Sequence, residues 1–253
     1  MLNINDMSII ITGGCSGLGY GMAKKYSSQG AKVTICGRRE SKVKEAQNSL
    51  GSNVIAIVAD ITEINDRKKL IETSLNHGGK IDVLINNAGN MYRGPIDELN
   101  QSELLNIFNT NVISGMMMLG ESKKYLAKTK GVNIFIGSVH NRRAFPGASP
   151  YAATKGALET LTKVLAAELG IEKIRVNCVV PGGVFTEINQ RAGIFDDKSA
   201  KKRLDEMASI HALGRIGTAE EIAEAVEYLI CSEWTTGAIL DVDGGLGLGL
   251  TNA

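Results

Sequence analysis

The chain has 253 residues, of which 43% are hydrophobic and 22% are charged, and its net charge is +1. This hydrophobic fraction is enough for a substantial core, which excludes a largely disordered chain. The near-neutral balance gives no general attraction to nucleic acid or to an anionic membrane. Because no linker-like stretch divides the sequence, we expect residues 1–253 to form a single domain.

The sequence also lacks the usual signals of export, membrane insertion and metal binding. No apolar run approaches the ~18 residues of a membrane helix, and the first residues do not resemble a secretory signal. The four cysteines are scattered without a C-x-x-C pair, and no histidine lies beside them. We therefore expect a soluble, cytoplasmic protein with no metal site.

Short, mostly β-branched apolar runs alternate with longer segments of helical spacing. The runs cover 7–12, 31–36, 54–59, 81–85, 132–136, 174–180 and 239–242; the helical segments include 18–29, 43–50, 68–76, 103–128 and 151–169. The first six runs are nearly continuous, as expected for strands covered by helices on both faces. The pattern predicts an α/β fold, a doubly wound parallel sheet of about seven strands.

One long irregular segment, residues 182–210, interrupts the alternation after the sixth run. It follows the carboxyl end of a predicted strand, which is where ligands bind in open α/β sheets. We expect a substrate lid here, with a plain surface insertion as the alternative.

A glycine-rich turn joins the first predicted strand to the first helix, with the spacing T-G-x-x-x-G-x-G over residues 12–19. Glycines permit close approach of the backbone to a pyrophosphate, and a helix N-terminus supplies free N–H groups. The turn therefore predicts a dinucleotide site that includes Gly13, Cys15, Ser16, Gly17, Leu18 and Gly19.

The end of the second strand indicates which dinucleotide is bound. It reads Cys36-Gly37-Arg38-Arg39, with no carboxylate for the ribose hydroxyls before Glu40. Gly37 is expected to leave space, and the guanidinium of Arg38 matches a phosphate, so we predict NADP(H). Asp60, after the third strand, is either an acceptor for the adenine amino group or a helix cap. The turn Asn87-Ala88-Gly89 suits backbone lying against a cofactor.

The candidate catalytic residues are Tyr151 and Lys155, which share one helix face at spacing i, i+4, and Ser138 at the end of the preceding strand. Carbonyl reduction needs a proton donor and a group that polarises the oxygen. A Y-x-x-x-K pair alone is common on helix surfaces, so the interpretation depends on the other motifs.

Together, the glycine-rich turn, Asn86-Asn87-Ala88-Gly89, Ser138, Tyr151-x-x-x-Lys155 and Pro181-Gly182 resemble the classical short-chain dehydrogenase/reductases. The resemblance implies a Rossmann-type fold, with Tyr151 as general acid/base and Ser138 orienting the substrate oxygen. It implies that Lys155 lowers the pKa of the tyrosine and holds the nicotinamide ribose. Asn111 matches the family asparagine of a water-linked proton relay.

The same resemblance extends the expected cofactor site and implies a homotetramer or dimer. The added cofactor residues are Arg39, Ile61, Pro181, Gly182, Val184 and Thr186. Many NADP-preferring members have a basic residue where this chain has Ser16, so NAD is also possible.

The expected substrate is a small ketone or aldehyde, or the corresponding alcohol. Carbonyl reductases, 3-oxoacyl reductases and sugar or polyol dehydrogenases all share these motifs, and His140, Asn141, Phe185 and Asn189 are candidate substrate residues. The alternative is a non-catalytic NADP-binding regulator, which typically lacks one of the catalytic residues that are all present here.

Overall fold

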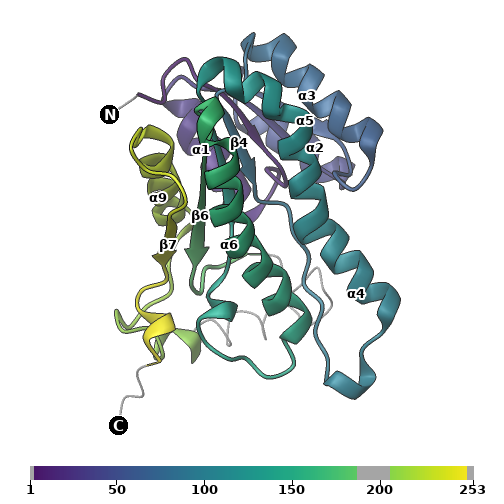
Figure 1. Cartoon of the computed structure of the whole chain (residues 1–253), viewed down its shortest axis with the longest axis vertical. Coiled ribbons are helices and arrows are strands. Elements are labelled where there is room, and N and C mark those ends of the chain that lie inside the picture. Colours follow the sequence, from purple (N-terminus) through teal and green to yellow (C-terminus); the bar gives the residue numbers. More distant parts are fainter. Residues whose placement is uncertain (1–2, 187–205, 250–253) are drawn as a thin grey trace.

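The computed structural model describes residues 3–186 and 206–249. Its centre is a parallel sheet of seven strands in the order β3-β2-β1-β4-β5-β6-β7 (Figure 1). The strands are β1 (Ser8–Ile11), β2 (Lys32–Gly37), β3 (Val54–Val58), β4 (Val83–Asn86), β5 (Val132–Ile136), β6 (Arg175–Pro181) and β7 (Ile239–Val242). All seven overlap the predicted runs, and the Rossmann-type doubly wound fold is confirmed.

Helices pack on both faces of the sheet. They are α1 (Gly17–Ser28), α2 (Glu40–Ser49), α3 (Ile64–Gly78), α4 (Gln101–Phe108), α5 (Ser114–Thr129), α6 (Ser149–Leu169) and α9 (Ala219–Cys231). In β1, Ile9 and Ile11 join the core beneath α1, α2 and α9, whereas Ile10 joins the core beneath α3, α5 and α6. Because successive strand residues point to opposite faces, this explains why the predicted runs are continuously apolar.

Two helical features differ from the sequence prediction. Segment 103–128 is not one regular helix, because a π-helical turn, η2 (Asn109–Ile113), separates α4 from α5. Helix α9 is not among the helical segments predicted from the sequence, although it begins with a capping box. In that box, Thr218 Oγ1 accepts a hydrogen bond from Glu221 N, and Glu221 accepts one from Thr218 N.

A partly buried arginine holds the end of α9 against the sheet. The guanidinium of Arg175, at the start of β6, donates to the carbonyls of Leu229 and Ile230 at 2.6 Å each. These carbonyls have no partner within the helix, and the positive charge faces the negative end of the helix dipole. The contact fixes β6, the strand that leads into Pro181 and Gly182.

The sheet order reverses between β1 and β4, since β1 leads outward to β2 and β3 while β4 leads the other way. Loops after these two strands therefore diverge and leave a crevice at the carboxyl edge. Most of the segment predicted as a lid, including Asn189, lies outside the described residues. In the part of the chain that is described, no helix is both long and apolar enough to cross a membrane.

Candidate active site

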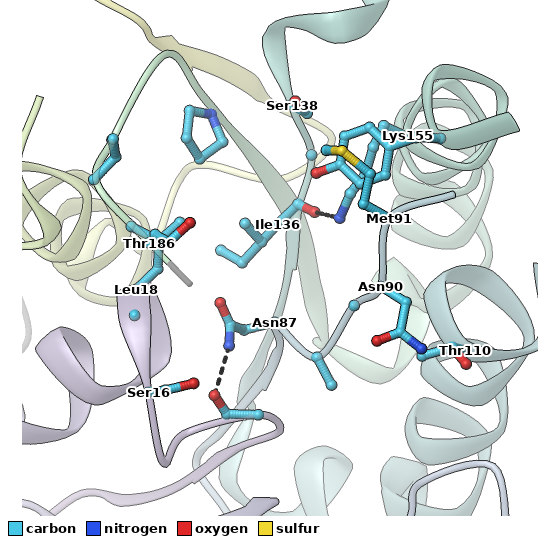
Figure 2. Close-up of a pocket in the computed structure, with 18 of the residues that line it drawn as sticks. Ser16, Leu18, Asn87, Asn90, Met91, Thr110, Ile136, Ser138, Lys155 and Thr186 are labelled. Carbon is cyan, nitrogen blue, oxygen red and sulfur yellow. Dashed lines mark hydrogen bonds between the residues drawn. The ribbon is translucent and has the colours of Figure 1, made fainter. Parts of the chain in front are cut away.

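The glycine-rich turn is held against the loop that follows β4. Asn87 Nδ2 donates to the carbonyls of Thr12 (2.9 Å) and Gly13 (3.2 Å), and Figure 2 shows the Asn87 amide directed at the glycine-rich turn. Thr12 Oγ1 accepts from the backbone N–H groups of Asn87 and Ala88. A Cβ on Gly13 would lie 2.9 Å from Ala88 Cα, and one on Gly19 would lie 2.5 Å from Gly13 O. Both glycines are therefore required by close backbone approach.

A cavity opens above this junction along the carboxyl edge of the sheet. Eighteen of the predicted site residues line it: Gly13, Ser16, Gly17, Leu18, Arg38, Asp60, Ile61, Asn87, Ala88, Gly89, Ser138, His140, Tyr151, Lys155, Pro181, Gly182, Val184 and Thr186. Thr186 reaches back to the first turn, since a Cβ on Gly17 would lie 3.3 Å from its Cγ2. Residues far apart in the sequence, such as Ser16 and Thr186, thus enclose one cavity (Figure 2).

Arg38 crosses the crevice at the adenosine end predicted from the sequence. Its guanidinium lies 3.7 Å from the carboxylate of Asp60 and donates to Asn90 Oδ1 at 3.3 Å. Asp60 does not cap α3, because its Oδ1 accepts from Thr62 N in a tight turn and the helix begins after Glu63. The side chain of Arg38 is 54% exposed, so a phosphate can reach it from solvent.

Gly37 lines the cavity and puts no side chain into it, and Cys15 packs beside it. A Cβ there would lie 3.2 Å from Cys15 Sγ, so the cysteine occupies the position next to Gly37. Arg39 turns toward the glycine-rich turn, where it donates to Ser16 Oγ at 3.4 Å. Cys15, Gly19 and Arg39 do not line the cavity; Cys15 and Gly19 are buried, whereas Arg39 is exposed.

Ser138 follows β5 and begins a single 3-10 turn, η3 (Val139–Asn141). Its Oγ lies 3.0 Å from Nδ1 of His140. The imidazole ring is edge-on to the ring of Tyr151, with centroids 5.1 Å apart, and stacks near Phe145 at 4.4 Å. The histidine therefore contacts both a candidate catalytic hydroxyl and the candidate catalytic phenol.

Tyr151 and Lys155 lie on the first turns of α6 and are buried at 7% and 4% exposure. Lys155 Nζ donates to the carbonyl of Ile136 at 2.8 Å, the bond drawn in Figure 2, and lies 5.5 Å from the centroid of the tyrosine ring. Burial raises the pKa of Tyr151 to about 12, and the Ser138 hydroxyl acts in the opposite direction. Burial lowers the pKa of Lys155 to about 8.

These directions refine the expectation that Lys155 lowers the pKa of the tyrosine. The lysine is itself removed from water, which disfavours its charged form. At Tyr151, desolvation outweighs the opposing hydrogen bond with Ser138 and determines the direction of the pKa shift.

Asn111 lies in the π turn, one layer behind the cavity wall. Its amide exchanges two hydrogen bonds with the backbone of Asn90, at 2.8 and 2.9 Å, and donates to Thr154 Oγ1 at 3.1 Å. A Cβ on Gly89 would lie 3.3 Å from Asn111 Oδ1 and 3.8 Å from Lys155 Nζ. The asparagine thus fixes the backbone beside the lysine, at a π turn of the kind often found at functional sites.

The remaining substrate candidates differ in position. His140 lines the cavity, whereas Asn141 and Phe185 do not. The cavity also has lining residues that sequence reasoning missed: Cys36, Ala59, Asn90, Met91, Arg93, Thr110, Ile136, Gly137, Phe145, Gly183 and Met207. Those at strand ends follow from the rule that ligands bind there. Arg93 and Phe145 lie in irregular segments, for which no periodic pattern exists, whereas Met207 is helical and falls within the segment 182–210 that was predicted as irregular.

Comparison with known proteins assigns the family. A family model described as enoyl-(acyl carrier protein) reductase matches residues 13–247. A chloroplastic tropinone reductase homologue of Arabidopsis thaliana is 32% identical, in an alignment that covers 97% of this chain and 77% of that protein. The 3-oxoacyl-(acyl-carrier-protein) reductase of Chlamydia muridarum is 33% identical, over 95% of this chain and 97% of its own.

A solved structure agrees with these relatives. The 3-ketoacyl-(acyl-carrier-protein) reductase of Brucella melitensis, complexed with NADH, superimposes with a TM-score of 0.87 at 30% identity. The match covers 96% of this chain and 99% of that one. The chain therefore belongs to the short-chain dehydrogenase/reductase family of oxidoreductases.

The depressed pKa of Lys155 gives a testable dependence of stability on pH. Its ordinary value is 10.5 and its folded value about 8, so between these pH values the unfolded chain binds more protons and this residue's contribution to stability rises with pH. Lys155→Met removes that contribution. We expect the stability of wild type relative to the variant to increase from pH 8 to 10.5 by on the order of 3 kcal/mol.

Urea denaturation at several pH values measures this difference. Lys163→Met, which replaces an exposed lysine on the same helix, is the matched control. A difference between wild type and Lys155→Met that does not change with pH would contradict the assignment.

Proposed function

We propose that this protein is an NADP(H)-dependent oxidoreductase that interconverts a ketone or aldehyde and its alcohol. The observation that carries the proposal is the meeting of Ser138, Tyr151 and Lys155 in the cavity whose other end contains the glycine-rich turn. The cradle fits a dinucleotide, because Gly13, Ser16 and Gly17 line the cavity at the N-terminus of α1, where backbone N–H groups are free to bind a pyrophosphate. The family relationship supports the reaction class.

When bound, the nicotinamide supplies or accepts a hydride at the substrate carbon. The residues of this chain then have to manage the charge and the proton at the substrate oxygen. A phenol with a pKa of about 12 remains protonated near neutrality, so Tyr151 is prepared to donate a proton as the alcohol forms. Ser138 hydrogen-bonds the same oxygen, and Lys155 provides positive charge near the tyrosine ring.

The contact with His140 supports the assignment of Ser138. With a proton on Nδ1, the imidazole donates to Ser138 Oγ across the 3.0 Å contact. The hydroxyl hydrogen of the serine is then available to the substrate oxygen. Ser138 Oγ also accepts a long hydrogen bond from the His140 backbone at 3.4 Å, so its orientation is determined from two directions.

Arg38 supports NADP(H) over NAD(H). It is a half-exposed guanidinium at the end of β2, where an acidic residue would otherwise serve the ribose hydroxyls. Its bonds to Asp60 and Asn90 set its position across the crevice. NAD(H) remains the alternative cofactor, since a relative binds NADH and Ser16 carries no charge.

The substrate class is a carbonyl compound or alcohol, with 3-oxoacyl compounds and sugars or polyols as candidate subclasses. Relatives named as tropinone reductase homologue and 3-oxoacyl reductase support the carbonyl chemistry. A non-catalytic NADP-binding regulator is the competing proposal. It is disfavoured because the buried Tyr151–Lys155 pair carries a desolvation cost that cofactor binding alone does not require.

Tyr151→Phe separates the reductase from the regulator. The change removes the proton donor and preserves the ring, so we expect the rate of NADPH oxidation with a carbonyl substrate to fall at least ~100-fold. NADPH binding, followed by nicotinamide fluorescence, should change little. Unchanged turnover in the variant would refute the assignment, and tight NADPH binding without turnover in wild type would favour the regulator.

Arg38→Ala tests the cofactor preference. Loss of a charge-assisted contact worth about 1.5–3 kcal/mol should weaken NADPH binding roughly 10- to 100-fold and NADH binding much less. Titration of both cofactors into wild type and variant measures the ratio. Lys44→Ala, which removes an exposed charge paired with Glu40 on α2, is the control. Equal losses for the two cofactors would exclude Arg38 as the phosphate ligand.

We also propose that two or four copies of the chain assemble. An apolar face on α4, η2 and α5, formed by Leu105, Ile113, Met116 and Met117, is 41–64% exposed and fits a second copy. Met117→Glu places a charge within it and should shift the protein to smaller species in sedimentation velocity. Lys128→Glu, at the end of α5, is the control; a wild type that is already monomeric would contradict the proposal.

A further inference from the structure

The part of the cavity around His140 contains an arginine to which the proposed chemistry gives no role. Met91 and Arg93 both line the cavity, whereas Tyr92 between them does not and accepts a hydrogen bond from Asn100 N at 2.8 Å. The loop after β4 therefore directs alternate side chains into the cavity. Arg93 is partly buried there.

Two hydrogen bonds tie Arg93 to the loop that carries the ring contacts of the site. Its guanidinium donates to Pro146 O at 3.3 Å, and Gly94 N donates to Gly147 O at 2.9 Å. The neighbouring Phe145 stacks on His140, which in turn contacts Ser138 and Tyr151. A continuous series of contacts thus connects Arg93 to the groups that handle the substrate oxygen.

The charges along the cavity wall are distributed unevenly. Asp60 is the single acidic residue among the described residues that line the cavity, and it pairs with Arg38. Lys155 is bound to a backbone carbonyl beside Tyr151. The lining residues also include Met91, Phe145 and Met207, and Arg93 is a partly buried cation among them. A partly buried guanidinium attracts an anion more strongly than a fully exposed one, because less water screens the attraction.

We propose that Arg93 binds a carboxylate on the substrate, so that this enzyme prefers carbonyl compounds that carry an acid group. The planar guanidinium matches a carboxylate in a two-point contact, and the bond to Pro146 O restricts its orientation before the substrate arrives. A carboxylate would join or replace the contacts that the guanidinium makes within the protein. The inference rests on the proposed reductase function and adds the substrate class.

Matched acid and ester probes test the proposal. The probes are oxo acids with the ketone two to five carbons from the carboxyl carbon, each compared with its neutral methyl ester. Binding to the enzyme–NADPH complex is followed by nicotinamide fluorescence, and reduction by loss of NADPH absorbance. We expect wild type to bind the best acid at least 10-fold more tightly than its ester.

Two substitutions separate the charge of Arg93 from its contact with the loop. Arg93→Gln retains an amide that can donate to Pro146 O but has no charge, whereas Arg93→Lys retains the charge without the planar fork. Arg93→Gln should weaken binding of the acid at least 10-fold and binding of the ester less than 3-fold. Arg93→Lys should keep part of the preference for the acid. Arg143→Gln, on the neighbouring loop and outside the cavity lining, is the control.

The outcomes are distinct. Equal binding of acids and esters by wild type, or equal losses of both in Arg93→Gln, would overturn the proposal. Reduction of esters without any acid preference would leave the reductase function standing and remove only the carboxylate site. Arg93-dependent acid binding without reduction of any probe would support the carboxylate site and contradict the reductase function.

Discussion

The close approach of the turn after β1 to the loop after β4 is the constraint on which the site depends. Thr12 and Asn87 hold the two segments together through side chain and backbone, and Gly13 and Gly19 permit the approach. The first segment opens α1, whose N-terminal N–H groups face the crevice, and the second continues to the backbone that Asn111 fixes beside Lys155. One junction therefore sets the distance between the two ends of the cavity.

At the candidate catalytic end, desolvation and hydrogen bonding act against each other. Tyr151 and Lys155 are placed where burial opposes ionisation of both, and a backbone carbonyl from β5 holds the ammonium. Such an arrangement costs stability, because ionisable groups are more stable in water. Proteins retain such groups where their proton affinity matters, which is why this pair is informative about function.

The sequence predicted the strands well because a strand buried on both faces needs a short, continuous apolar run. The glycine-rich turn and Ser138 were likewise predictable, since each directly follows such a run. Tyr151 and Lys155 were predicted only through the family resemblance, because a Y-x-x-x-K pair alone is common on helix surfaces. The π turn was not, because hydrophobic spacing continues through it. Arg93 and Phe145 lie in irregular loops, and the tight packing of Cys15 against Gly37 depends on a tertiary contact that no local pattern reveals.

The π turn links the exposed apolar face on α4 and α5 to the cavity wall behind Lys155. A π turn accommodates one more residue than an α-helical turn, and each residue advances an α-helix by about 100°. Removing one residue from Asn109–Ile113 would therefore rotate α5 about its own axis relative to α4. Exposed Met116 and Met117 would turn away from the side shared with Leu105, and Asn111 would lose its alignment with Asn90. The length of this one turn therefore determines how α5 is rotated about its axis, and with it the direction of the outer apolar face and the position of the wall behind Lys155.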